Sequence, residues 1–358
     1  MTAGVDHLQV SRLIDERRRA LAEVITEYHY KAHPELAQRY GAAGRARCVQ
    51  DNEYHLAYLS DAITAELPML FTDYIAWTKV MLAGRGILVE DLAENLQFMR
   101  DALARGLPAD AGQLAIIYVD AGFERLPESP STLPEILSDD APFGDLARNY
   151  LSALLRRERH LASRLIIAAA QSGISVWDIY LHVFQRCQYE IGRLWQMNQI
   201  SVAEEHYCTA ATQMVMSQLY PYLFSGQKSG RTLVAACVAG DLHEIGARFV
   251  SDFLELEGWN TIYLGANVPS SDIVKLLNDR EVDVLALSAT MTFHVRVVAD
   301  LIADIRASPA GVKVKIMVGG YPFNIAPELW RRVGADAWAR DALEAISVAD
   351  RLTSAKIS

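Results

Sequence analysis

The sequence predicts a multidomain protein in which two helical segments precede a C-terminal α/β segment built on a parallel sheet. Apolar residues recur at three- and four-residue spacing over residues 8–124 and again from residue 146 to about residue 224, which is the helical period. After residue 231 the period changes, because short β-rich runs alternate with helical segments. A proline-rich stretch separates the two helical segments.

The first predicted domain, residues 1–125, is all-helical. Its helices are expected to break at Pro34, at Pro68, and at the glycine-containing turns 84–86 and 106–108. The following sequence, RLPESPSTLPEILSDDAPFGD, contains four prolines, which are incompatible with a continuous helix. Residues 126–145 are therefore predicted to form an interdomain linker.

The second helical segment, residues 146–224, is predicted to be an antiparallel bundle, because its helices are joined by short turns. The predicted helices cover residues 147–171, 176–197 and 202–223. Ser201 stands three residues before Glu204, which is a capping-box pattern for a helix that begins near Val202.

The C-terminal segment, residues 231–358, has the alternation of strands and helices that is typical of an open parallel sheet. The predicted strands lie in LVAACVAG, NTIYLG, VDVLALSAT, VKVKIMVGG and ADAWA, and the helices lie near 245–257, 269–279, 295–307 and 325–333. We expect a flavodoxin-like (Rossmann-like) five-stranded sheet covered on both faces. In that strand order the first, third and fourth strands are neighbours, and ligands bind at their carboxyl ends.

Composition narrows the class of partner. A net charge of -10 and a pI near 5.4 give no general attraction to nucleic acid or to an anionic membrane. The four cysteines have no metal-binding spacing, so free thiols in a reducing compartment are expected. Neither a signal peptide nor a membrane-spanning apolar run is apparent. We therefore expect a cytoplasmic protein that contacts neither membrane nor nucleic acid directly.

Polar and glycine residues follow the three strands that the predicted sheet brings together. The turn GDLHEIG follows the first strand, SAT ends the third, and GG ends the fourth. The residues of interest are Asp241, Leu242, His243, Gly246, Ser288, Thr290, Gly319 and Gly320. Because the carboxyl ends of these strands border one crevice, we expect a single ligand site there.

This pattern resembles the cobalamin-binding domain of methionine synthase and its relatives. In this chain 41 residues (247–287) separate Gly246 from Ser288, and 28 residues (291–318) separate Thr290 from Gly319. The resemblance implies that His243 is the lower axial ligand of cobalt and that Asp241 holds its other ring nitrogen. A carboxylate in that place would fix the tautomer of the histidine. The strand-end residues would then border the channel for the nucleotide tail, with Thr290 where the family has leucine.

The bundle carries a second motif at one end of a helical hairpin. Trp195 lies at the end of one predicted helix, and Glu205 and His206 lie in the first turn of the next, so all three share one end of the antiparallel pair. Their spacing resembles that of adenosylcobalamin-dependent photoreceptors, in which these residues surround the 5′-deoxyadenosyl group. Gln196 stands where a histidine can follow the tryptophan in those proteins.

The first domain suggests a further chromophore. CVQDNEYHLAYLSDAI and LPMLFTDYIAWTKVML resemble non-haem globin-like sensor domains, and the whole arrangement resembles the photocobilins. That resemblance implies noncovalent biliverdin binding. The candidate bilin-binding residues are Arg45, Arg47, Tyr54, His55, Tyr58, Tyr74 and Trp77. The alternative is that these aromatic residues, which recur at helical spacing, belong to a helical core.

Two functions follow from these resemblances. The first is a light-sensing protein, not an enzyme, that binds adenosylcobalamin through His243 and also binds biliverdin. Photolysis of its cobalt–carbon bond would alter a homo-oligomer or the binding of a separate output protein. The second is a corrinoid methyl-carrier protein of a cobalamin-dependent methyltransferase system. His243 suits both, whereas the Trp195, Glu205 and His206 motif favours the first, because only an adenosyl group needs that pocket.

Overall fold

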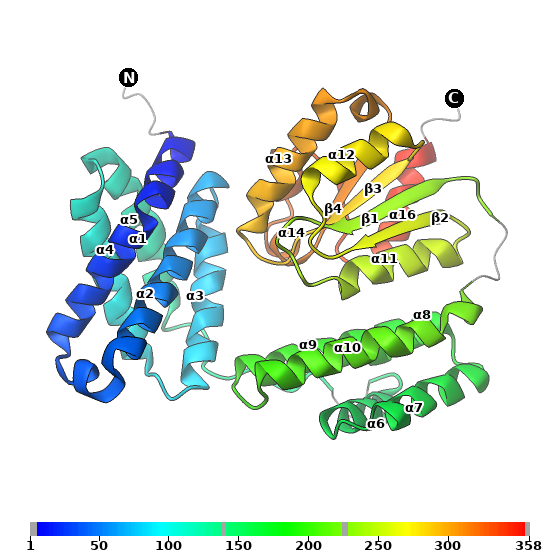
Figure 1. Cartoon of the computed structure of the whole chain (residues 1–358), viewed down its shortest axis with the longest axis horizontal. Coiled ribbons are helices and arrows are strands. Elements are labelled where there is room, and N and C mark those ends of the chain that lie inside the picture. Colours follow the sequence, from blue (N-terminus) through cyan, green and yellow to red (C-terminus); the bar gives the residue numbers. More distant parts are fainter. Residues whose placement is uncertain (1–5, 138–140, 224–227, 355–358) are drawn as a thin grey trace. The chain divides into compact units, whose positions relative to one another are not determined.

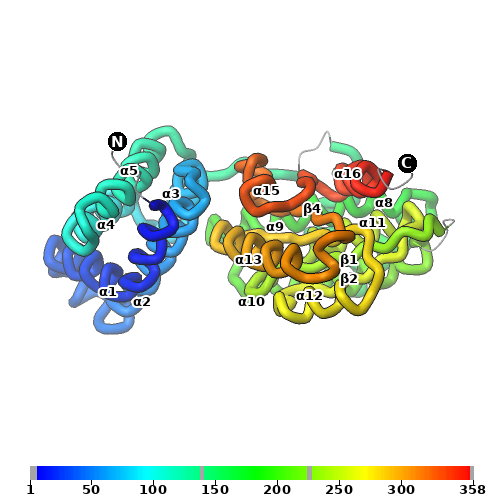
Figure 2. Tube along the Cα trace, turned by 90° about the horizontal axis from the view of Figure 1, so that it is seen from above, coloured from blue at the N-terminus to red at the C-terminus, as the bar shows by residue number. Residues whose placement is uncertain are grey.

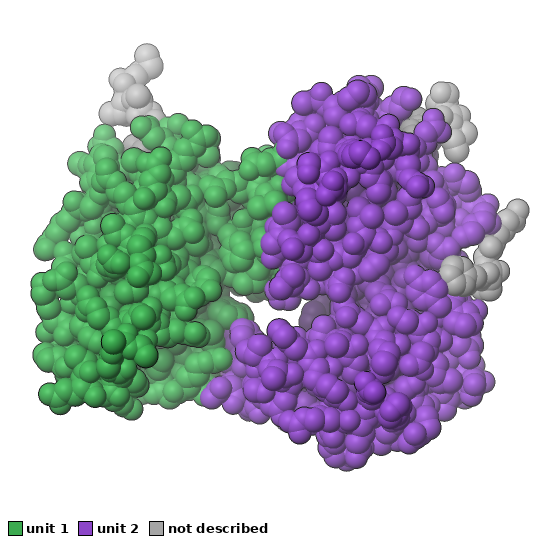
Figure 3. Space-filling view, in the orientation of Figure 1, with its two compact units in different colours: residues 1–131, 290–300, 321–333 green, residues 132–289, 301–320, 334–358 purple. Residues whose placement is uncertain are grey.

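The computed structural model describes residues 6–137, 141–223 and 228–354. These residues form two compact units, which Figure 3 distinguishes by colour. The first unit runs to residue 131 and also contains residues 290–300 and 321–333, and the remaining described residues form the second. The finer division predicted from the sequence, into residues 1–125, 126–145, 146–224 and 231–358, remains a prediction.

Five helices make up most of the first unit. They are α1 (His7–Ala32), α2 (Glu35–Thr64), α3 (Pro68–Ala83), α4 (Val89–Gly106) and α5 (Ala109–Arg125). α1 packs along α2 and also contacts α4, and α4 pairs with α5 (Figure 2). Pro68 occupies the first position of α3, where no helical N–H is needed. The predicted helical character and the break at Pro68 are confirmed, but a globin-like fold is not.

The bundle in the second unit differs from the prediction at its first helix. Its elements are α6 (Gly144–Leu155), α7 (Arg159–Gln171), α8 (Val176–Asp178), a π-helical turn (Ile179–Phe184), α9 (Gln185–Gln196), α10 (Val202–Gln218) and a 3₁₀ turn (Tyr220–Tyr222). The single helix predicted over 147–171 is broken at Arg157, which has a φ of 62°. The apolar period continues across the break because Leu154 and Ala162 are buried in the same core.

Five parallel strands form the sheet, in the predicted order β2-β1-β3-β4-β5. They are β1 (Thr232–Cys237), β2 (Asn260–Gly265), β3 (Val284–Ser288), β4 (Lys315–Gly319) and β5 (Ala337–Trp338). Leu233, Val284 and Met317, from three adjacent strands, are buried in one core with Trp259 and Val348. This core lies under the helices of one sheet face, so the register of the strands determines which side chains it contains.

Helices cover both faces of this sheet. In the second unit these are α11 (Ile245–Leu256), α12 (Ser270–Asp279) and α16 (Ala342–Ser354). α13 (His294–Ala307) is divided between the two units, and α14 (Tyr321–Ile325) and α15 (Leu329–Arg332) belong to the first. α11 and α16 pack together on one face, and α12 lies on the other (Figure 1). Of the helix predicted over 325–333 only the short α15 forms, because α14 already ends at Ile325 and Pro327 disfavours helical geometry at the residue before it. α16 was not predicted from the sequence.

The bundle and the sheet share a hydrophobic core through α11. The ring centroids of Trp177 and Phe253 lie 4.1 Å apart, and those of Tyr180 and Phe249 lie 4.7 Å apart. The Tyr180 hydroxyl donates a 2.8 Å hydrogen bond to the Asp252 carboxylate inside this apolar contact. These contacts fix α11, and therefore the loop that precedes it, against the bundle.

Asp252 gives this junction a predicted pH dependence. Burial raises the pKa of Asp252 to about 6 from an ordinary value of 3.8. A raised carboxyl pKa means that the folded state keeps the proton when the unfolded state has lost it, so the free energy of unfolding falls as pH rises from about 4 to about 6. The fall is expected to be at most about 3 kcal/mol.

Asp252→Asn should remove this pH-dependent part, because asparagine accepts the Tyr180 hydrogen bond without ionising. Urea unfolding of the intact chain between pH 4 and 7, followed by circular dichroism, measures the difference from wild type. Asp145→Asn, at an exposed carboxylate of α6, is the matched control. An unfolding free energy of Asp252→Asn that changes with pH as in wild type would contradict this account of the junction.

Within the described ranges, no helix combines the length and apolar character that crossing a bilayer requires. Cys48, Cys187, Cys208 and Cys237 are free thiols, as the sequence predicts.

Candidate functional site

The loop between β1 and α11 presents a histidine held by a buried carboxylate. Asp241 is 0 % exposed, although it is a carboxylic acid in a loop, four residues beyond the end of β1. Its backbone N–H donates to the carbonyl of Val238, and its own carbonyl accepts from the N–H of Asn267. The loop therefore fixes Asp241 through its backbone and leaves the carboxylate to act on a neighbouring side chain.

That neighbour is His243. Its Nδ1 lies 2.8 Å from Asp241 Oδ1, and its backbone N–H donates to the same oxygen at 3.0 Å. An Nδ1–H that donates to a carboxylate leaves Nε2 with a lone pair, and the side chain of His243 is 60 % exposed. The hydrogen bond that His243 donates to Asp241 raises the pKa of His243, burial opposes the rise, and the charges of Asp241 and Glu205 add to it. His243 can therefore offer a basic, oriented nitrogen to a ligand.

The carboxyl ends of β3 and β4 lie on the same edge of the sheet as this loop, because β3 pairs with β1 and β4 pairs with β3. Ser288 is in register with Cys237 of β1 and with Gly319 of β4. Gly320 has a φ of 104°, and a Cβ placed on it would lie 2.0 Å from the carbonyl oxygen of Ala289. Only glycine satisfies both conditions. The described strand ends thus approach one another more closely than side chains would permit.

The remaining predicted residues of this site differ in exposure. Leu242 is exposed beside His243, and Thr290, two residues beyond Ser288, is half-buried. Gly246 lies in the first turn of α11, and a Cβ there would meet no atom within 4 Å. Gly246 therefore has no close packing that requires a glycine.

Sequence reasoning missed two residues that hold the loop in place. The Asn267 side chain accepts the N–H of Gly240 at 2.7 Å. Glu244 accepts hydrogen bonds from Gln213 of α10 at 2.7 Å and from the Tyr263 hydroxyl at 2.8 Å. The position of Asn267, two residues after the second strand, was a signal for its role, whereas the contact between Glu244 and Gln213 depends on tertiary packing.

The hairpin of α9 and α10 brings the second predicted motif to one end, as expected. Ser201 and Glu204 form the predicted capping box at the start of α10. Glu205 contacts His206 Nδ1 at 2.5 Å and accepts a hydrogen bond from Thr209 at 2.8 Å. The side chain of His206 is 74 % exposed, and Trp195 is half-buried. The charge of Glu205 is the smallest of the contributions that raise the pKa of His243.

The candidate bilin residues do not form one cluster. His55 Nδ1 lies 2.8 Å from the Tyr74 hydroxyl, and the rings of Tyr58 and Tyr74 stack at 3.7 Å. Trp77 stacks on Tyr74 with a centroid distance of 6.4 Å. These four aromatic side chains pack against one another, which is the arrangement that the alternative prediction of a helical core describes. The other three candidates are exposed residues of α2, namely Arg45, Arg47 and Tyr54.

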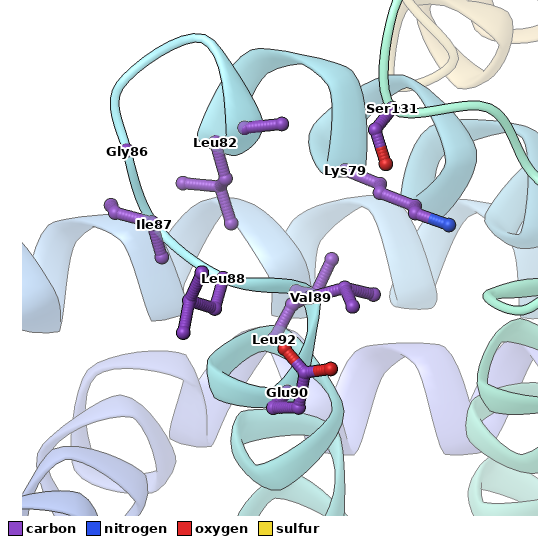
Figure 4. A pocket seen from close by; sticks show the side chains of 10 residues that line it. Lys79, Leu82, Gly86, Ile87, Leu88, Val89, Glu90, Leu92 and Ser131 are labelled. Atoms are coloured by element: carbon purple, nitrogen blue, oxygen red, sulfur yellow. The ribbon is translucent and has the colours of Figure 1, made fainter.

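A pocket of about 240 Å³ in the first unit is lined by other residues (Figure 4). Its lining residues are Lys79, Leu82, Ala83, Gly86, Ile87, Leu88, Val89, Glu90, Leu92 and Ser131. The ammonium group of Lys79 donates to the carbonyls of Leu126 and Ser129 at 2.7 and 2.6 Å. The cation at this pocket is therefore already paired with backbone oxygens.

Comparison with known proteins identifies the class. A family model described as "B12 binding domain" matches residues 231–347, and a second model with the same description matches residues 146–220. The parallel sheet, the oriented His243 and these matches define a cobalamin-binding protein. Residues 6–131 lie outside both matches.

Relatives narrow this class to a family. The chain is 30 % identical over 166 residues to the dimethylamine corrinoid protein of Methanosarcina barkeri, covering 46 % of this chain and 75 % of that protein. It is 31 % identical over 166 residues to dimethylamine corrinoid protein 3 of Methanosarcina mazei, covering 46 % and 95 %. The solved structure of the M. barkeri monomethylamine corrinoid protein is similar, with a TM-score of 0.53 and 25 % identity, covering 59 % of this chain and all of that chain. The chain belongs to this family of corrinoid proteins.

These relatives correct the function expected from the sequence. They are corrinoid proteins named for methylamines, so the light-sensing function is wrong, and the alternative of a corrinoid methyl carrier is favoured. A corrinoid cofactor is supported by both family matches, whereas biliverdin and an adenosyl upper ligand are not. The prediction of an adenosyl group rested on the spacing of Trp195, Glu205 and His206. That spacing alone does not establish which group lies above the corrin.

The residues of the loop fit a corrinoid. The exposed imidazole of His243 has one nitrogen fixed by Asp241, and this leaves the other for a metal. At Gly320 the backbone takes a conformation and a close approach that a side chain would obstruct.

Proposed function

We propose that this chain is a corrinoid methyl carrier that serves partner methyltransferases. The observation that carries the proposal is the Asp241–His243 pair at the carboxyl end of β1, where Nδ1 is held at 2.8 Å and the imidazole is exposed. The membership of the chain in a family of methylamine corrinoid proteins supports the same function. When bound, the corrinoid would supply a cobalt ion that can carry a methyl group.

In this proposal His243 would hold the cobalt ion through Nε2. Asp241 is a positioning residue, because it accepts the Nδ1–H and so fixes the tautomer and raises the basicity of the imidazole. Ser288, Thr290 and the pair Gly319 and Gly320 would border the nucleotide tail. Leu242 and Gly246 would lie beside the cofactor on the loop and the first turn of α11.

The hairpin end of the bundle would lie near the upper side of the cofactor. Support comes from the electrostatic influence of Glu205 on His243 and from the hydrogen bond between Gln213 and Glu244. A methyl group is small, so Trp195, Glu205 and His206 would shield it from solvent without filling a nucleoside pocket. The donor and acceptor of the methyl group would be separate partner proteins. The homo-oligomer expected from the sequence remains a prediction.

Trp195→Ala and Glu205→Ala test this use of the hairpin. Because a methyl group does not fill an adenosyl pocket, each variant is expected to retain methylcobalamin and adenosylcobalamin with affinities changed by the same factor, to within about threefold. Gel filtration of the intact chain in darkness after loading, followed by the absorption spectrum of the protein fraction, gives the retained cofactor.

Wild type supplies the reference in the same test. It is expected to retain one equivalent of methylcobalamin, with a spectrum of histidine-ligated cobalt. A chain that retains adenosylcobalamin but releases methylcobalamin would overturn the proposal. A loss in either variant that is confined to adenosylcobalamin would also contradict it.

A further inference from the structure

Two histidines and a glutamate meet between α1 and α4, far along the chain from His243. His29 and His33 are one helical turn apart at the end of α1, and Glu94 lies near the start of α4. One ligand atom from each of the three lies within 4.8 Å of the other two. We propose that His29, His33 and Glu94 bind a divalent transition-metal ion of the zinc class.

The distances suit such an ion. His33 Nε2 already lies 2.5 Å from Glu94 Oε2. Zinc binds imidazole nitrogen and carboxylate oxygen at about 2.0–2.2 Å, which puts tetrahedral ligand atoms about 3.3 Å apart. The group therefore closes on a metal with small side-chain rotations, in which His33 and Glu94 separate slightly and His29 approaches.

Neighbouring side chains orient both histidines. Glu35 Oε1 lies 3.3 Å from His33 Nδ1, so a carboxylate can hold that nitrogen while Nε2 faces the metal position. The ring of His29 packs edge-on against Phe98, one turn beyond Glu94 on α4, with a centroid distance of 5.8 Å. Nδ1 of His29 is buried and has no hydrogen-bond partner among the residues that the structure describes. An unsatisfied buried ring nitrogen beside two metal-ligating groups is the observation that a bound ion would explain.

The charges around the group favour a cation. Burial, and then the neighbouring His33, lower the pKa of His29, which favours the neutral imidazole that a metal ion needs as a ligand. The hydrogen bond to Glu94 raises the pKa of His33, with Glu35 acting in the same direction. Without a metal, a proton on His33 bridges it to Glu94. Metal binding would displace that proton and cross-link α1 to α4.

This site is independent of the proposed methyl carrier, because residues 6–131 lie outside both cobalamin-binding matches. Three protein ligands leave a fourth position for water or another donor. Histidine and carboxylate ligands together favour zinc-class ions over magnesium or calcium, which prefer oxygen ligands alone.

Competition for Zn²⁺ against a chromophoric chelator tests the proposal on the intact, metal-stripped chain. The experiment uses a His243→Ala background, which removes the exposed histidine of the cobalamin loop. This background is expected to bind one tight equivalent of zinc. His29→Ala and His33→Ala should each weaken that binding by more than about 100-fold, and Glu94→Gln by about 10- to 100-fold. His160→Ala, at an exposed histidine of α7, is the matched control and should bind as the background does.

Glu94→Gln keeps the size and hydrogen-bonding capacity of the side chain, so it separates loss of a ligand from loss of the fold. As a second readout, zinc should raise the melting temperature of the background but not that of folded Glu94→Gln. Unchanged zinc affinity in both His33→Ala and Glu94→Gln would overturn the proposal. The absence of a tight equivalent in the background would overturn it as well.

Discussion

His243→Ala is expected to lower the retention of methylcobalamin by the intact chain more than about 100-fold and to abolish the spectrum of histidine-ligated cobalt. The reason is that the variant removes the one exposed nitrogen that the buried Asp241 orients at the carboxyl end of β1. Gel filtration followed by absorption spectroscopy measures both quantities. His160→Ala, in the bundle, should retain the cofactor as wild type does.

Asp241→Asn distinguishes ligation from positioning at the same loop. The variant keeps the histidine but weakens the hydrogen bond that fixes its tautomer, so a loss of about 10- to 100-fold is expected, smaller than that of His243→Ala. If the histidine-ligated spectrum persists in His243→Ala, the assignment of the lower ligand is wrong. An Asp241→Asn loss larger than that of His243→Ala would also contradict these roles.

Gly320→Ala is expected to destabilise the folded chain by about 3–5 kcal/mol and to reduce cofactor retention in parallel. A Cβ at this position would lie 2.0 Å from the backbone carbonyl of Ala289, and the φ of 104° is a conformation that alanine rarely adopts. The backbone of Ala289 would have to move to relieve the clash, and Ala289 directly follows β3, which lies at the centre of the sheet. Thermal and urea unfolding measure the loss.

Gly192→Ala is the matched control, since a Cβ there meets no atom within 4 Å and the residue lies inside α9. Alanine in a helix interior is favoured by up to about 1 kcal/mol over glycine, so this variant should be as stable as wild type or slightly more stable. A Gly320→Ala chain with wild-type stability would show that the strand ends can separate without cost.

Most of the C-terminal fold could be predicted from the sequence because periodicity carries that information locally. The change from helical to β-rich runs after residue 231 gave the strands, and the alternation of strands with helices gave the parallel order that the structure has. The break at Arg157 could not be predicted in this way. Both sides of the break face the same core, so the apolar pattern runs through it.

The loop of the candidate site was predictable because Asp241 and His243 are two residues apart and follow a strand. Their partners were not, since Asn267 and Glu244 act through contacts that only folding creates. The group of His29, His33 and Glu94 could not be predicted from the sequence for the same reason. His29 and His33 show helical spacing, but Glu94 is brought to them by the packing of α1 against α4.

The aromatic residues of the first unit show why a functional prediction from side-chain type fails. A stretch rich in tyrosine, histidine and tryptophan suits a chromophore pocket and a helical core equally well in sequence. The structure stacks Tyr58 on Tyr74 at 3.7 Å and hydrogen-bonds His55 to Tyr74, so these polar groups are satisfied by one another. Cofactor-binding residues need free polar groups, and sequence alone does not show which are free.

Transfer of a labelled methyl group tests the central claim most directly. The intact chain is loaded with cobalamin, reduced, methylated in darkness with isotopically labelled methyl iodide and separated from free reagent by gel filtration. It is then incubated with a thiol and a corrinoid-dependent thiol methyltransferase. If the chain is a methyl carrier, it will hold about one label per bound cobalamin and pass it to the thiol, and His243→Ala will carry little. A chain that holds cobalamin stoichiometrically but gives no labelled thiol with any such methyltransferase would contradict the account.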